Sequence, residues 1–128
     1  MKCLIDTHTL LWYTLNESPL SSAAHQLIIN QNNEILISPA SYWEIAIKIS
    51  IGKLILHQSY KDFIDVCLNQ YQFNILAITP EHTDALITLP FYHKGPFDRL
   101  LVAQAIVENI PIISVDTILD RYGIQRLW

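Results

Sequence analysis

The chain has 128 residues, a length typical of one domain that buries its own core without disulfides or structural metals. Apolar residues make up 51% of it and charged residues only 16%, against a usual charged share of about 25%. Such a composition indicates either a surface made for a partner or a small domain with a rich core. The net charge of −4 argues against binding a polyanion by bulk electrostatics.

Strand-like and helical segments alternate along the chain. At two places, Ser38-Pro39 and Thr79-Pro80, a capping residue precedes a proline that suits the first helical turn. The predicted strands are 3–6, 35–37, 74–78, 112–115 and an edge strand at 124–128, and the predicted helices are 7–15, 22–31, 39–51, 60–71, one beginning near 80, 96–108 and 116–122. This alternation predicts an α/β fold in a single domain over residues 1–128, a three-layer α/β/α sandwich with a mainly parallel central sheet.

The cysteines and the apolar segments indicate where the protein resides. Cys3 falls in a strand-like run and Cys67 in a helical one, so both are expected to be buried, reduced thiols. Asp6 and His8 interrupt the first apolar stretch, which is therefore unlike a signal peptide. No apolar run approaches the ~18 residues of a membrane span. We expect a soluble, cytoplasmic protein with no membrane partner.

Four carboxylates stand where such a fold would bring them together. Asp6 and Asp116 each close a short apolar run, Asp98 follows Gly95-Pro96 at a helix start, and Glu44 interrupts an otherwise apolar helix. Ligands of parallel sheets bind in the crevice outside the carboxyl ends of the strands. Acids crowded there repel one another unless a cation neutralises them, and Mg²⁺ or Mn²⁺ prefers carboxylate oxygens. The pattern predicts a metal site suited to phosphodiester hydrolysis, because such an ion activates water and stabilises a phosphoryl oxyanion.

Each acid also has a structural explanation. Asp6 and Asp116 could be helix N-caps, worth about 1 kcal/mol each, and Asp98 could complement the dipole of its helix. Glu44 is the hardest to explain in this way. An ion pair with Lys48 one turn later is worth only about 0.3–0.5 kcal/mol, less than a half-buried carboxylate needs.

Four further residues are predicted to support the site. Thr7 and Ser114 are placed to hydrogen-bond the acids or a water on the metal. Arg99 could hold a substrate phosphate or, equally, pair with an acid such as Asp98. His93 precedes the helix of Asp98 and is expected to line the mouth of the crevice.

Four segments carry a recognisable pattern in chain order. They read Leu4-Ile5-Asp6-Thr7-His8-Thr9-Leu10-Leu11-Trp12, Ser38-Pro39-Ala40-Ser41-Tyr42-Trp43-Glu44-Ile45, Pro96-Phe97-Asp98-Arg99-Leu100-Leu101 and Ile113-Ser114-Val115-Asp116. Together they resemble the PIN domain, and more closely the VapC-type toxins of type II toxin–antitoxin pairs. The resemblance covers the whole chain and extends to Tyr122-Gly123-Ile124 and Leu127-Trp128.

This resemblance implies a Mg²⁺- or Mn²⁺-dependent endoribonuclease. Such toxins are usually dimeric and are inhibited by a cognate antitoxin whose C-terminal segment lies across the active-site groove. The family's acids map onto Asp6, Glu44, Asp98 and Asp116, which would be catalytic metal ligands. Asp6 and Asp98 would be the firmest ligands, and the other two would bind directly or through water.

The chain departs from the family pattern at one position. The family often has an acid where this chain has Gly95. Because Gly95 is not one of the four core acids, we expect activity to survive. The departure bears on the occupancy of a second metal and on the cap of the helix that carries Asp98.

Two other functions are compatible with the same residues. An aspartyl-phosphate phosphatase would use Asp6 as its nucleophile, but it usually needs a second acid two residues later, where this chain has His8. A non-catalytic protein-binding module would use the acids only as caps. A phosphoaspartate trapped at Asp6 would identify the phosphatase, and an intact fold that binds no divalent metal would identify the module.

Overall fold

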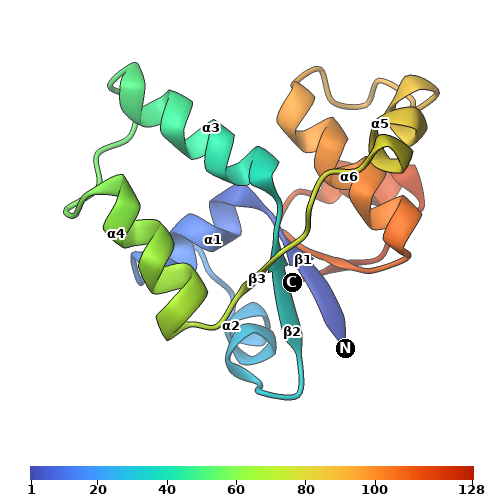
Figure 1. The fold of residues 1–128 in the computed structure, drawn as a ribbon. Helices are drawn as coiled ribbons and strands as arrows, with labels where there is room; N and C mark the ends of the chain where they lie inside the picture. The colour runs from blue at the N-terminus through green and yellow to red at the C-terminus, as the bar shows by residue number, and fades with distance from the viewer.

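Five short parallel strands form the central sheet of the computed structural model, which describes residues 1–128 (Figure 1). They are Lys2–Ile5 (β1), Glu34–Ile37 (β2), Asn74–Ile75 (β3), Ile112–Ile113 (β4) and Arg126–Leu127 (β5). Their order in the sheet is β3-β2-β1-β4-β5, and every neighbouring pair is parallel. The predicted α/β architecture with a parallel sheet is confirmed.

Helices cover both faces of this sheet. They are Thr7–Thr14 (α1), Ser22–Ile29 (α2), Pro39–Ser50 (α3), Tyr60–Asp65 (α4), Pro80–Ile87 (α5) and Pro96–Glu108 (α6), with a π-helical turn at Val66–Gln70 (η1) and a 3₁₀ turn at Thr117–Tyr122 (η2). One core cluster joins side chains of α1 to α4 to the sheet, and a second joins α6, η2 and Leu89, which follows α5, to its other face. Figure 1 shows these two groups of helices on opposite sides of β1 and β2. No helix is both long and apolar enough to cross a membrane.

The strand β1 shows why the sheet lies in the middle of the molecule. Its successive side chains point to opposite faces, as in any strand. Cys3 and Ile5 pack in the first core cluster and Leu4 in the second, and all three are fully buried. A strand buried on both faces reads as a continuous apolar run, which is the pattern seen in the sequence.

Two helix starts follow the predicted capping chemistry. The hydroxyl of Ser38 accepts a hydrogen bond from the Ala40 amide at 3.1 Å, ahead of Pro39 in the first turn of α3. Before α5, the Thr79 hydroxyl accepts from the His82 amide, and the His82 ring accepts in return from the Thr79 amide at 3.0 Å. This reciprocal capping satisfies two amides that would otherwise have no partner at the helix end.

Several predicted elements are longer than the observed ones, and two of them have a clear physical reason. The predicted helix 60–71 is α-helical only to Asp65 and continues as the wider turn η1, in which the Tyr71 amide donates to the Val66 carbonyl. Apolar spacing over one turn does not distinguish these two geometries. The predicted strand 74–78 ends at Ile75, and the carbonyl of Leu76 instead accepts a hydrogen bond from the buried Gln104 side chain.

Candidate functional site

The strand order brings two of the predicted acids to neighbouring strand ends. Ile5 of β1 lies opposite Ile113 of β4 in the parallel register, and the Asp6 amide donates to the Ile113 carbonyl at 3.3 Å. Asp6 follows β1 directly, and Asp116 stands a few residues after β4. Both therefore lie at the carboxyl edge of the sheet, as predicted.

Asp6 is both a cap and an available carboxylate. Its Oδ1 accepts from the Thr9 amide at 2.8 Å and so begins α1. The residue is only 9% exposed. No protein group donates to its second oxygen, Oδ2. The structural explanation considered for Asp6 is thus correct, and it leaves one oxygen free for a ligand.

Thr7 contributes to packing rather than to the acids. Its hydroxyl donates to the hydroxyl of Ser41 at 3.0 Å, and both residues are buried. This bond ties the first turn of α1 to α3. The structure therefore shows no hydrogen bond from the Thr7 hydroxyl to an acid, and its contact with a water on the metal stays a prediction.

Glu44 extends from α3 and pairs with Lys48 one turn later. The Lys48 ammonium lies 3.0 Å from the Glu44 carboxylate, whose side chain is 15% exposed. Residues three apart on a helix share a face, so Glu44 and the buried Ser41 lie on the same side of α3. The carboxylate therefore has a cationic partner but remains open enough to accept another ligand.

Asp98 occupies the first turn of α6, and the pKa of its carboxyl depends on the charges of the other acids. Partial desolvation of its carboxyl raises its pKa, His93 opposes this rise, and the negative charges of Glu44, Asp116 and Asp6 add to it. Asp98 as a residue is exposed, so the desolvation comes from the groups around the carboxyl and not from burial in the core. The four carboxylates thus lie within electrostatic reach of one another, and we call them the acidic cluster.

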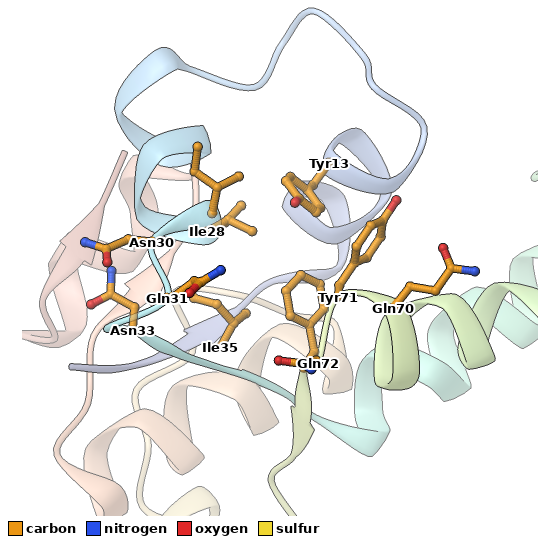
Figure 2. A pocket seen from close by; sticks show the side chains of 11 residues that line it. Tyr13, Ile28, Asn30, Gln31, Asn33, Ile35, Gln70, Tyr71 and Gln72 are labelled. Carbon is orange, nitrogen blue, oxygen red and sulfur yellow. The ribbon is translucent and has the colours of Figure 1, made fainter.

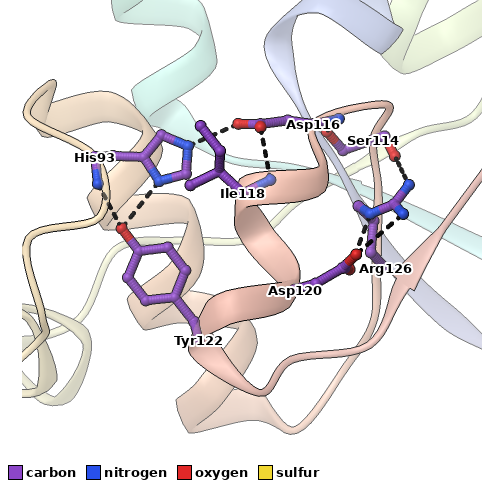
Figure 3. Close-up of polar contacts among 7 residues, drawn as sticks. All are labelled: His93, Ser114, Asp116, Ile118, Asp120, Tyr122 and Arg126. Atoms are coloured by element: carbon purple, nitrogen blue, oxygen red, sulfur yellow. Dashed lines mark hydrogen bonds and ion pairs between the residues drawn. The ribbon is translucent and has the colours of Figure 1, made fainter.

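Asp116 is held by three hydrogen bonds (Figure 3). Its Oδ1 accepts from the Ile118 amide at 3.0 Å, and its Oδ2 lies 2.6 Å from Nε2 of His93. Its own amide donates to the hydroxyl of Ser114, which is fully buried. Ser114 therefore supports the site as predicted, although it does so through the backbone of Asp116.

His93 reaches this site from the segment before α6. Its side chain is only 9% exposed, and its ring stacks on Tyr122 with an interplanar angle of 8°. It contacts Asp116 directly, so it borders the acidic cluster as the sequence suggested. Its partner Tyr122 was not among the predicted site residues, and neither was Ser41.

Ser41 and Tyr122 differ in whether the sequence could have identified them. Ser41 precedes Glu44 by three positions on one helix, a spacing that places both on one face, so the sequence contained a sufficient clue. Tyr122 meets His93 only because η2 folds back against the segment before α6. No local pattern predicts that contact.

Arg99 is a structural residue, which corrects both predicted roles. Its guanidinium donates to the carbonyls of Pro90 at 2.8 Å, Leu89 at 3.2 Å and Leu86 at 3.3 Å. The residue is 6% exposed, and its guanidinium lies over the Phe91 ring. It forms no ion pair with an acid and has no free face for a phosphate, because it closes the end of α5 against α6.

The donor set of the acidic cluster fits a hard divalent cation held largely through water. No three His, Cys, Asp or Glu side chains converge closely enough to form a complete metal cage. Mg²⁺ usually keeps several waters and needs only one or two carboxylates. An oxygen-only cluster in which three carboxylates raise the pKa of a fourth has the charge that such an ion would neutralise.

A cavity of about 460 Å³ lies away from these acids, beside the amino ends of β2 and β3 (Figure 2). Its polar lining consists of amides and tyrosines, with no charged or imidazole side chain. Tyr13, Tyr71 and Phe73 form an aromatic group in its wall, with ring centroids 5.1 to 5.9 Å apart. It lacks an acid, a base and a nucleophile, so we place the candidate site at the acidic cluster.

The comparisons with known proteins agree with this geometry. The PIN domain model matches residues 3–125. No curated protein matches the sequence. A structure of VapBC2 from Rickettsia felis bound to a promoter DNA fragment superposes with a TM-score of 0.73 at 17% identity, covering 100% of both chains.

Two further solved structures share the fold. VapBC-1 from nontypeable Haemophilus influenzae gives a TM-score of 0.66 at 18% identity, covering 98% of this chain and 96% of the other. FitAcB from Neisseria gonorrhoeae gives 0.65 at 14% identity, also covering 98% and 96%. At these identities the likeness is one of fold.

Proposed function

This chain belongs to the PIN domain family, and on that premise we propose that it is a metal-dependent endoribonuclease and the toxin of a toxin–antitoxin pair. PIN domains are generally nucleases. Fold neighbours in VapBC and FitAB complexes and the four VapC-like motifs of the sequence support the narrower proposal.

One observation carries the proposal. Four carboxylates from separate parts of the chain act on one another at the carboxyl edge of the sheet, and three of them raise the pKa of Asp98. A protein that used these acids only as caps would have no reason to bring Glu44 and Asp98 into the same group, because neither caps its helix.

The residues of the cluster have distinct parts in this proposal. Asp6, with a free Oδ2, and Asp98 would hold Mg²⁺ or Mn²⁺ most directly, and Glu44 and Asp116 would hold its waters. When bound, such an ion lowers the pKa of water and stabilises the oxyanion of a phosphodiester. Lys48 and His93 orient Glu44 and Asp116 by the contacts at 3.0 Å and 2.6 Å.

The phosphatase alternative finds no support in the geometry. Its acid or base would stand two residues after Asp6, at His8. That side chain is exposed and lies against Trp12, with ring centroids 5.9 Å apart. The chain therefore has no carboxylate two residues after Asp6 to serve as the acid or base.

The proposed partners are single-stranded RNA, a cognate antitoxin and a second copy of this chain. Large apolar side chains remain on the surface, as the low charge content predicted, among them Ile55 at 79%, Phe91 at 78%, Ile87 at 76% and Trp43 at 62% exposure. Burial of such side chains is what stabilises a protein interface. A homodimer with an antitoxin seated near the acidic cluster would cover part of this surface.

Asparagine variants test the activity. Asp6→Asn and Asp98→Asn should each reduce Mn²⁺-dependent cleavage of single-stranded RNA by more than about 100-fold, since loss of a group that only supports a ligand already costs 10- to 100-fold. Both variants should keep the wild-type circular dichroism spectrum. Asp84→Asn, an exposed acid on α5, is the matched control and should cleave normally. Wild-type cleavage by both cluster variants would refute the proposal.

A further inference from the structure

We infer that Tyr122 and His93 form a positioning pair for Asp116, in which Tyr122 selects the tautomer of His93 and His93 fixes the Asp116 carboxylate. The inference rests on the proposed function in so far as Asp116 serves the nuclease reaction. It assigns to Tyr122 a role that neither its sequence context nor the family match provides. Figure 3 shows Tyr122, His93 and Asp116 joined by hydrogen bonds, with His93 in the middle.

The tautomer follows from the partners of the two ring nitrogens. The backbone amide of His93 donates to the Tyr122 hydroxyl oxygen at 2.8 Å. The same oxygen lies 2.9 Å from Nδ1 of His93. The ionised Asp116 carboxylate 2.6 Å from Nε2 can only accept, so Nε2 carries the proton of the neutral ring and the Tyr122 hydroxyl donates its own proton to Nδ1. Nδ1 is then an acceptor, and the ring proton resides on Nε2.

The hydrogen bond from Nε2 orients the Asp116 carboxylate. A proton on Nε2 donates to Oδ2 of Asp116 across 2.6 Å. Since the Ile118 amide holds Oδ1 at 3.0 Å, both oxygens have a donor, and the plane of the carboxylate is set. The opposite tautomer would face Oδ2 with a lone pair, and that contact would be repulsive.

Burial shows which part of the network is support and which is exposed to ligands. The His93 side chain is 9% exposed, whereas that of Asp116 is 35% exposed. The ring also packs flat against Tyr122, with centroids 5.6 Å apart. His93 is therefore shielded from ligands, and it acts through Asp116, whose remaining lone pairs are open to solvent.

Two substitutions separate positioning from a purely structural link. His93→Gln places an amide nitrogen near the position of Nε2 and keeps a donor for Asp116. His93→Asn places its amide near Nδ1 and loses that donor. Both lose the stacked ring, so a structural role alone predicts equal effects from the two.

The measurements are Mn²⁺ affinity, by electron paramagnetic resonance, and cleavage of a long single-stranded RNA of mixed sequence. His93→Asn should lose about 10- to 100-fold in kcat or in Mn²⁺ affinity, with little change in KM for RNA. His93→Gln should recover most of that loss at the same melting temperature. His57→Asn, an exposed histidine in a loop, is the matched control and should behave as wild type.

A measurement on the metal-free protein tests the tautomer without any activity. Long-range ¹H–¹⁵N correlation spectra should show the proton of the neutral His93 ring on Nε2, and Tyr122→Phe, which removes the donor to Nδ1, should lower the fraction of that tautomer. A wild-type ring protonated on Nδ1 would overturn the inference, and so would equal impairment of the Gln and Asn variants or no impairment of either. If the wild type neither binds Mn²⁺ nor cleaves RNA, the proposed function fails, while the spectra still decide how His93 holds Asp116.

Discussion

The two edges of the sheet carry opposite chemistry. At the carboxyl edge, four carboxylates and a histidine gather, and the pKa of Asp98 is raised by its neighbours. At the amino edge, the cavity of Figure 2 is lined by amides, tyrosines and apolar side chains without one charged group. The difference shows that the carboxylates that act on one another lie where the strands end, whereas the cavity at the other edge offers only neutral groups.

Helix polarity accounts for much of this contrast. In a parallel βα fold the helices begin at the carboxyl edge, where free amides favour acids, and end at the amino edge, where free carbonyls favour donors. Asp6 and Asp116 accept from amides of α1 and η2. At the other edge, the Asn33 side chain donates to the Leu27 carbonyl of α2 at 3.0 Å. Capping thus places acids at the same edge as ligands, and a cap and a metal ligand are compatible roles.

The largest expected effect concerns a charge at the carboxyl edge that is not part of the site. Arg99→Met should lower the free energy of unfolding by about 2–4 kcal/mol, because the carbonyls of Leu86, Leu89 and Pro90 lose the buried guanidinium that donates to them. Urea unfolding measures this change. Lys61→Met, which removes an exposed cation on α4, should change stability by no more than about 0.5 kcal/mol. Weakened RNA binding at unchanged stability would restore Arg99 to the site.

Metal binding should stabilise the protein through the carboxyl edge of the sheet and not through the amino edge. At ten times its Kd, Mg²⁺ or Mn²⁺ should stabilise the protein by about 1.4 kcal/mol, seen as a higher melting temperature. Asp6→Asn should abolish the increase, whereas Gln70→Ala at the amino-edge cavity should retain it. An increase that persists in Asp6→Asn would place the metal elsewhere.

The pH dependence of stability should originate at the carboxyl edge. The folded-state pKa of Asp98 is raised, first by desolvation and then by the other carboxylates, so the folded protein binds this proton more tightly than the unfolded chain. Its contribution destabilises the metal-free protein above the raised pKa and is relieved as the pH falls towards the ordinary value. Asp98→Asn should therefore melt slightly higher near neutrality and lose this part of the pH dependence. The effect should be smaller than that of metal, because Asp98 is exposed and solvent screens it.

The smallest expected effect concerns the departure from the family pattern. Gly95 precedes α6 with φ −71°, and no side chain caps that helix. A Cβ there would lie 3.9 Å from Oδ2 of Asp98, which is ordinary contact. Gly95→Ser should stabilise the protein by about 0.5–1 kcal/mol through a new cap and a less flexible unfolded chain. Gly95→Ala, which supplies the Cβ without the cap, should stabilise the protein less than Gly95→Ser in the same thermal melts.

Local chemistry made much of the fold predictable. The Ser38-Pro39 and Thr79-Pro80 signatures located the starts of α3 and α5, and the apolar runs ending at Asp6 and near Asp116 located β1 and β4. In each case a few adjacent residues determine the backbone. The acids could be assigned to one edge because parallel strands leave no other place for residues that follow them.

Contacts between distant segments could not be predicted in the same way. Arg99 meets the carbonyls at the end of α5 only in the packed structure, so its sequence neighbour Asp98 suggested the wrong role. The contact of Tyr122 with His93 joins residues 29 positions apart. Glu44 could be singled out from its apolar helix, and Lys48, the partner that the spacing offered, does lie 3.0 Å from its carboxylate.

The chain order of the acidic cluster has a consequence for biosynthesis. Its members lie at positions 6, 44, 98 and 116, and Asp116 reaches the others only when β4 pairs with β1, the first strand made. A ribosome that has released the chain only as far as α6 therefore holds a protein without the complete cluster. The order of synthesis therefore delays assembly of the acidic cluster until nearly the whole domain has emerged.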